Sequence, residues 1–252
     1  MRIRCTLLVA FSMGAGLWAD GRGDLAAALG HLNGNGSVQA GIDFQLWTRQ
    51  TLGKRSSVRQ SEVKAQFQED EESLRITWPR VVVADLTLEE ERAARGEILT
   101  TAIRDQTKEL DPGRIHHLLD QATVLRRLMD QARFDSERAD AWEGKPARLV
   151  LFEFDPRIPE NKAGRLSRRS GSLKVWIAAD GTPLASSEVA EYGGKVGRFL
   201  GSFQSKTDTE TRYAVMQGRL VAAHREIEES SSESDGAERS DSRRVFDLKE
   251  KP

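Results

Sequence analysis

A strict alternation of apolar and polar residues is the feature that most constrains the fold of this chain. In the segment SVQAGIDFQLWT, apolar side chains recur at every second position, from Val38 through Ile42 to Leu46. Successive side chains of a strand point to opposite faces, whereas a helix repeats every 3.6 residues. The pattern therefore predicts a long strand with one buried face, which requires further strands to pair with it.

Two more segments continue the alternation close by in the sequence. SEVKAQFQ repeats it, and LRITW follows after the polar turn QEDEES. Pro79 then ends the pairing, because proline has no backbone N–H to donate to a neighbouring strand. The short connections predict three antiparallel strands.

The period changes in the middle of the chain. The stretch from Leu88 to Leu110 is rich in Glu, Arg and Ala, which favours one helix. A second helix is indicated by Asp111 as a cap and Pro112 at the first helical position. Its apolar stripe follows at steps of three and four: Ile115, Leu118, Leu119, Ala122, Leu125, Leu128, Met129 and Ala132. We expect a helical insertion over residues 87–141.

Strand signals return after Pro146 and continue almost to the end of the chain. Tight turns at Asp180–Pro183 and Gln217–Gly218 require antiparallel pairing of their neighbours. Residues 157–171 and 229–243 are polar and rich in serine, which predicts loops or hairpin tips. Seven candidate strands are RLVLFEF, LKVWIAA, residues 186–192, GRFLGSF, RYAVM, RLVAAHREI and RRVFDL.

These elements predict an α+β fold with one large, curved antiparallel sheet. The sheet has about ten strands, is half-barrel-like, and carries two helices inserted against its concave face. We expect one domain over residues 37–249, preceded by a flexible, polar lead over residues 20–36. A separate N-terminal hairpin domain is the alternative.

The first nineteen residues have the layout of a cleavable signal peptide. MRIR supplies positive charge, Cys5 to Trp18 is largely apolar, and the small residue Ala19 precedes Asp20. The apolar run is shorter than the roughly 20 residues of a membrane-spanning helix, and no later segment approaches that length. We therefore expect export, to the periplasm or beyond the cell, with no transmembrane segment in the mature chain. A buried N-terminal helix is the alternative.

No catalytic signature is found in the sequence. The adjacent His116 and His117 would diverge by about 100° on a helix and could not chelate a metal together. A nucleophile elbow is absent, and Cys5 is the only cysteine. Lys+Arg 38 and Asp+Glu 39 alternate in sign along the chain, so no basic face forms for nucleic acid. We expect a protein that is not an enzyme, with no metal and no cofactor.

One strand candidate is apolar on both faces. In RLVLFEF, Leu149 and Leu151 share one face while Val150, Phe152 and Phe154 share the other. Such a sheet needs cover on both sides, by ordinary packing or by an apolar ligand. The candidate ligand-lining residues are Phe152, Phe154, Trp176, Phe199 and Phe203.

The order of these elements resembles that of periplasmic lipoprotein-carrier half-barrels, the outer-membrane lipoprotein-sorting type, and of the related envelope-stress sensor. The resemblance is carried by the first strand VQAGIDFQLW, the hairpin ending in LRITWPR, the helical interlude and the turn in LKVWIAADGTPLASSEV. It implies a sheet wrapped around helices, with a lipid or lipoprotein acyl chain held between them. The alternative is an interaction or scaffolding module that meets another envelope protein through its helical insertion or its serine-rich loop.

Overall fold

The computed structural model describes residues 20–34, 36–97, 102–158, 166–195, 201–233 and 238–250. The predicted signal peptide, residues 1–19, and the candidate lining residue Phe199 lie outside the described residues.

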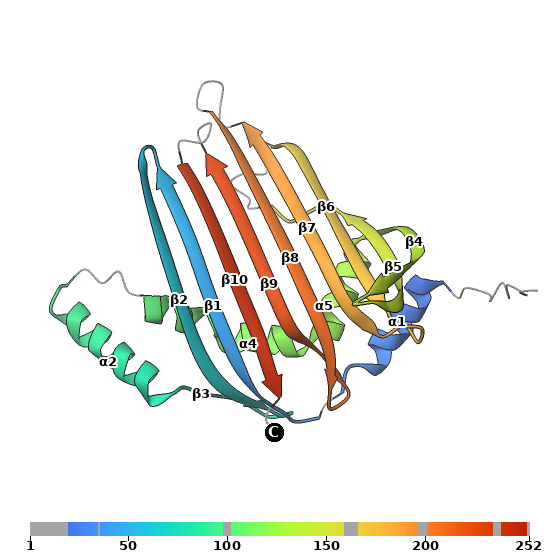
Figure 1. Cartoon of the computed structure of the whole chain (residues 1–252), viewed down its shortest axis with the longest axis horizontal. Coiled ribbons are helices and arrows are strands. Elements are labelled where there is room, and N and C mark those ends of the chain that lie inside the picture. The colour runs from blue at the N-terminus through green and yellow to red at the C-terminus, as the bar shows by residue number, and fades with distance from the viewer. Residues whose placement is uncertain are drawn as a thin grey trace, which may run out of the picture.

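The fold is α+β with a single, open antiparallel sheet, as the sequence predicts. Ten strands follow the order β3-β2-β1-β10-β9-β8-β7-β6-β5-β4, so the last strand lies beside the first in the middle of the sheet (Figure 1). The strands are β1 (Val38–Leu52), β2 (Arg55–Glu69), β3 (Leu74–Thr77), β4 (Arg133–Trp142), β5 (Lys145–Phe154), β6 (Leu166–Ile177), β7 (Pro183–Lys195), β8 (Ser202–Met216), β9 (Arg219–Glu233) and β10 (Glu238–Glu250). The predicted three-stranded start corresponds to β1, β2 and β3.

Five helices are described, and α4 and α5 lie behind the sheet in the view of Figure 1. They are α1 (Gly21–His31), α2 (Arg80–Ala94), α3 (Ala102–Glu109), α4 (Pro112–Leu119) and α5 (Gln121–Gln131). Helices α4 and α5 pack against β9, α1 packs against α5 and β5, and α3 packs against β2. This defines a helix-covered face and a helix-free face of the sheet. Helix α2 extends away from the sheet beyond β2 (Figure 1).

The N-terminal lead is more ordered than its polar composition predicts. Residues 20–36 were expected to be flexible, yet Gly21–His31 form α1. The side chain of Asp20 accepts a hydrogen bond from the Arg22 N–H at the start of the helix, and Leu25 and Leu29 are fully buried one turn apart. Two buried leucines at this spacing are enough to attach a short helix to a core that the local sequence does not reveal.

The helical insertion also differs from the predicted range of 87–141. Its helices begin at Arg80 and end at Gln131, and the expected second helix is divided at Asp120, whose side chain caps α5. The charged segment RFDSERADAW, expected within the insertion, forms the edge strand β4. This edge strand is rich in charged residues. It therefore lacks the alternation of apolar and polar residues by which a strand is recognised in a sequence.

The polar segments expected to be loops or hairpin tips are strand over most of their described residues. Residues 166–171 belong to β6, while β9 extends to Glu233 and β10 begins at Glu238. The segments GRFLGSF and RYAVM, as far as they are described, are the two ends of the single strand β8. Backbone pairing with long neighbouring strands sustains these polar ends, because ladder hydrogen bonds do not depend on the side chains.

The core is divided into two apolar clusters on either side of the sheet centre. One contains buried residues of β1, β2, β10 and α4, including Phe44 and Phe246, whose ring centroids lie 4.8 Å apart. The other contains buried residues of α1, α5, β5 and β6, including Phe152 and Val175. Among the described residues, no helix is both long and apolar enough to cross a membrane.

Candidate functional site

A row of cross-strand partners shows what separates the two apolar clusters. From β1 to β5 the paired residues are Phe44, Phe246, Arg225, Thr211, Ser186, Val175 and Val150. The row is apolar at both ends and polar over β9, β8 and β7. We call its polar centre, with two neighbours on the same face, the polar strip: Ser186, Glu188, Thr211, Tyr213 and Arg225.

A β-bulge determines which residue of β9 enters the polar strip. Arg212 pairs with His224 and Tyr213 pairs with Ala222, so Ala223 has no partner on β8. One extra residue reverses the alternation of side chains beyond it. Strict alternation places His224 on the face of Leu220 and Ala222, but the bulge gives that face to Arg225. His224 instead lies within 2.6 Å of Asp247 on the helix-free face.

Arg225 is a cation with little in the protein to compensate it. Its Nε is buried and has no hydrogen-bond partner, and no ion pair joins its guanidinium to a carboxylate of the described residues. Burial lowers the pKa of Arg225, while Tyr213 and Glu188 nearby oppose that change. Arg244 on β10 also has a buried Nε, but it forms ion pairs with Glu109 at 3.4 Å and Glu229 at 3.1 Å.

Glu188 is the anionic counterpart of Arg225 in the polar strip. Burial raises the pKa of the Glu188 carboxyl, and the charge of Arg225 offsets only part of that rise. Within the described chain Glu188 forms no ion pair, although the two groups are close enough to influence each other. Both residues keep an intermediate exposure, so solvent reaches part of each.

Tyr213 and His117 complete the surroundings of the two charges. The hydroxyls of Tyr213 and Ser186 lie 2.6 Å apart, and burial raises the pKa of Tyr213 to about 12. His117 comes from α4, which packs on β9; burial, followed by the charge of Arg225, lowers the pKa of its imidazole. At neutral pH both groups are therefore uncharged, and they add no charge of their own to the polar strip.

The polar strip offers two opposite charges and several hydroxyl groups. Ser186 hydrogen-bonds to a tyrosine rather than to a base, which gives it no activated nucleophile character. Over the described ranges, no group of three or more His, Cys, Asp or Glu residues could hold a metal ion. Two opposite charges and several hydroxyls can hold a polar group.

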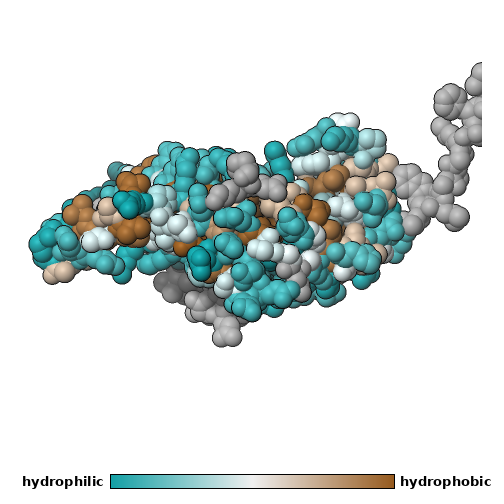
Figure 2. All heavy atoms as spheres, turned by 90° about the horizontal axis from the view of Figure 1, so that it is seen from below, coloured by the Kyte–Doolittle hydropathy of each residue, from teal (hydrophilic) through white to brown (hydrophobic). Residues whose placement is uncertain are grey.

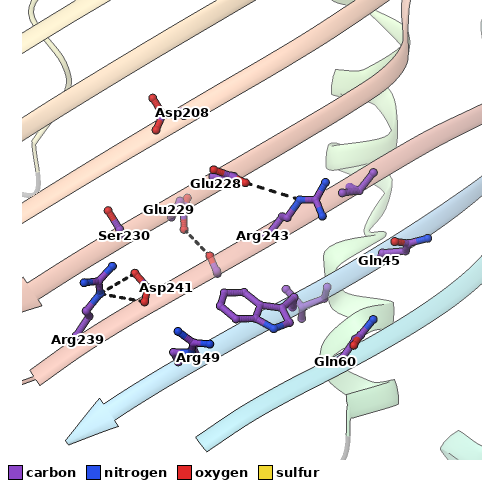
Figure 3. A pocket seen from close by; sticks show the side chains of 14 residues that line it. Gln45, Arg49, Gln60, Asp208, Glu228, Glu229, Ser230, Arg239, Asp241 and Arg243 are labelled. Atoms are coloured by element: carbon purple, nitrogen blue, oxygen red, sulfur yellow. Dashed lines mark hydrogen bonds and ion pairs between the residues drawn. The ribbon is translucent and has the colours of Figure 1, made fainter. Parts of the chain in front are cut away.

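A groove of about 570 Å³ lies on the helix-free face, between β1, β10 and β9 (Figure 3). Most of its charged side chains have a partner within the protein. The Nε of Arg243 lies 3.8 Å from Glu228, the Nε of Arg239 lies 3.0 Å from Asp241, and the guanidinium of Arg49 lies 5.2 Å from the ring centroid of Trp47. Unlike the polar strip, this groove contains charges that the protein itself compensates.

The predicted lining residues are not brought together. Phe152 is 1% exposed and packs edge-to-face with Phe134, whereas Phe154 lines an open pocket of about 650 Å³ beside β6. Phe203 is buried near Tyr192 of β7.

Trp176 lies on the helix-free face. Its ring centroid is 5.0 Å from that of Trp142, and its Nε1 donates a hydrogen bond to Asp140. Trp176 is also the cross-strand partner of Leu149, which is 1% exposed. On the second apolar face of β5, Leu149 is therefore buried within the protein itself, whereas Leu151 keeps an intermediate exposure.

Sequence reasoning missed the polar strip and the ion pairs of Glu69. Arg225 was hidden by the bulge, and Glu188 stood in a segment, ASSEVAEY, whose period is weak. Glu69 at the end of β2 lies 2.6 Å from His116 and 2.8 Å from Arg219. The sequence did contain a signal for this site, because Glu69 continues the buried positions of β2 at every second residue and so predicts a buried carboxylate.

Fold and site together define an open, ten-stranded antiparallel sheet with helices packed on it and a charged strip between two apolar clusters. The chain matches no protein-family model, and no curated protein or solved structure is significantly similar to it.

Proposed function

We propose that this chain is a non-catalytic, exported protein of the cell envelope that binds an apolar or amphiphilic ligand. The ligand would be an acyl chain, free or attached to a lipid or lipoprotein, held on the helix-covered face of the sheet. A periplasmic location fits the resemblance to lipoprotein-carrier half-barrels, which hold acyl chains between sheet and helices.

The observation that carries the proposal is the polar strip between the two apolar clusters. A core that served only stability would gain from apolar residues at the positions of Arg225 and Glu188, because buried unpaired charges are costly. Ligand sites are where proteins keep such groups, with a few polar side chains set among apolar ones. Arg225 and Glu188 both keep an intermediate exposure, so part of each side chain is in contact with solvent.

Native mass spectrometry of the purified protein beginning at Asp20 tests the proposal, together with titration of a fluorescent fatty acid. We expect co-purifying lipid or saturable binding of the probe. Absence of both would refute ligand binding.

Two neighbouring substitutions on β7 locate the ligand. Ala190 shares the face of Glu188, so Ala190→Trp should weaken binding of the fatty acid about tenfold or more by occupying space beside the strip. Glu191 has the opposite orientation, so Glu191→Trp should leave binding unchanged. Equal effects of the two variants would place the ligand elsewhere.

A specific observation favours a second function, that of an interaction module. Helix α2 exposes Val81, Val83 and Leu88 at 64%, 49% and 52%, and hydrophobic residues are visible at the end of the molecule where α2 lies (Figure 2). Exposed apolar side chains on an extended helix suit contact with another envelope protein. Val81→Asp with Leu88→Asp should then abolish capture of that protein and leave lipid binding intact.

A further inference from the structure

The charges of Arg225 and Glu188 lie on the same face but do not meet. Arg225 pairs with Thr211 of β8, whereas Glu188 pairs with Thr209, so the two charges lie diagonally across β8. Each influences the ionisation of the other, yet no ion pair forms between them. A direct salt bridge would be the simplest way to compensate two buried charges, and the structure does not make it.

The surroundings of the two charges restrict what could bridge them. An anion at Arg225 would also meet the carboxylate of Glu188, and a cation at Glu188 would meet the guanidinium of Arg225. The neighbouring Tyr213 and His117 are neutral at ordinary pH and offer hydrogen bonds rather than charge. A ligand that carries both signs a few ångströms apart would compensate both residues at once.

The flanks of the strip indicate what the rest of such a ligand is like. In the row through Arg225, the neighbour on one side is Phe246, and the row ends on the other side at Val175 and Val150. These residues belong to the two apolar clusters. The strip is therefore a polar site with two opposite charges in an otherwise apolar face of the sheet, which suits the zwitterionic head of an amphiphile.

We propose that the polar strip binds the headgroup of a zwitterionic phospholipid, with the phosphate at the guanidinium of Arg225 and the ammonium at the carboxylate of Glu188. This inference rests on the proposed function and specifies the ligand class of the same site. It distinguishes phospholipids such as phosphatidylethanolamine from fatty acids and from anionic phospholipids, which would leave Glu188 without a counterion.

A lipid-exchange experiment tests the assignment. The full mature protein is incubated with vesicles of equimolar phosphatidylethanolamine and phosphatidylglycerol, re-isolated, and its bound lipid is quantified by mass spectrometry. We expect wild type to be enriched in phosphatidylethanolamine by about tenfold, the effect of one charge-assisted contact. Arg225→Gln should lose most of the bound lipid, and Arg225→Lys should keep part of it.

Glu188→Gln provides the sharper arm, because it removes the repulsion of an anionic headgroup while keeping the shape of the side chain. This variant should lose the preference for phosphatidylethanolamine and bind phosphatidylglycerol at least as well. Arg243→Gln, on the helix-free face, is the matched control and should behave like wild type.

The outcomes separate the inference from the proposed function. If wild type binds no lipid of either kind, the proposed function fails. If it binds lipid without headgroup preference, or if Arg225→Gln and Glu188→Gln both keep the wild-type preference, lipid binding stands and the headgroup assignment is overturned. Circular dichroism of each variant verifies folding, and Arg225→Lys replaces Arg225→Gln if the latter does not fold.

Discussion

Replacing Arg225 separates a binding residue from a structural one, because the two roles predict opposite changes in stability. A structural arginine stabilises the fold through its contacts. Arg225 has a buried Nε without a partner and no ion pair to any described residue. We therefore expect Arg225→Met, combined with Glu188→Gln, to increase the free energy of unfolding.

The size of the gain follows from the groups that are removed. One buried donor without a partner costs about 1–3 kcal/mol, and the double substitution also removes a partly desolvated carboxylate. We expect a net gain of about 2 kcal/mol, which for a chain of this size corresponds to about 4–8 °C in Tm. Arg225→Met alone should gain less, because Glu188 then loses the nearby positive charge that lowers its pKa.

Urea unfolding followed by tryptophan fluorescence measures these differences at pH 7. The matched control is Arg244→Met on β10, because Arg244 has a similarly buried Nε but keeps its ion pairs with Glu109 and Glu229. Losing those pairs should cost about 2 kcal/mol. If the double variant is less stable than wild type by 1 kcal/mol or more (on the scale of one net hydrogen bond, ~1 kcal/mol), then Arg225 is structural and the argument for a ligand at the strip is refuted.

Three further predictions concern the surroundings of the strip and the core. The folded protein keeps the Tyr213 proton up to about pH 12, whereas the unfolded chain loses it near its ordinary pKa of 10.0; stability should fall by about 2.7 kcal/mol as pH rises across this interval, and less so in Tyr213→Phe, as alkaline urea titrations would show. Glu69→Ala should cost about 3 kcal/mol by leaving the largely buried Arg219 without its counterion, and a thermal melt should show no such loss for the exposed Glu71→Ala. Phe152→Ala should cost about 3–5 kcal/mol in urea unfolding by leaving a cavity in the cluster of α1 and α5, and a loss under 1 kcal/mol would contradict the packing described.

Much of the sheet could be predicted because several of its strands alternate apolar and polar residues. β1 and the inner half of β2 alternate strictly, and each has one buried face from Val38 to Phe44 and from Val63 to Phe67. The first turn of α4 followed from Asp111 and Pro112, whose roles as cap and first helical residue are confirmed. Where this alternation is absent, the prediction was less exact: the charged β4 was placed in a helical insertion, and the serine-rich end of β9 was expected to be a loop or a hairpin tip. Such strands form because their backbone pairs with an adjacent strand of the sheet. When that strand is distant in the sequence, no local sequence pattern indicates the pairing.

The polar strip could not be predicted, and the reason lies in one residue. Strict alternation from Leu220 onward would put His224 on the helix-covered face of the sheet. It would put Arg225 on the helix-free face, as an ordinary solvated arginine. Because Ala223 is unpaired in the bulge, His224 and Arg225 exchange faces. Bulges depend on the pairing of two strands rather than on the composition of one, so period alone cannot locate them. The same exchange places a cation between Phe246 and Thr211, where strict alternation would set an imidazole. A fold under selection for stability alone would have no reason to keep this arrangement, and so the bulge itself is an argument that the strip binds something.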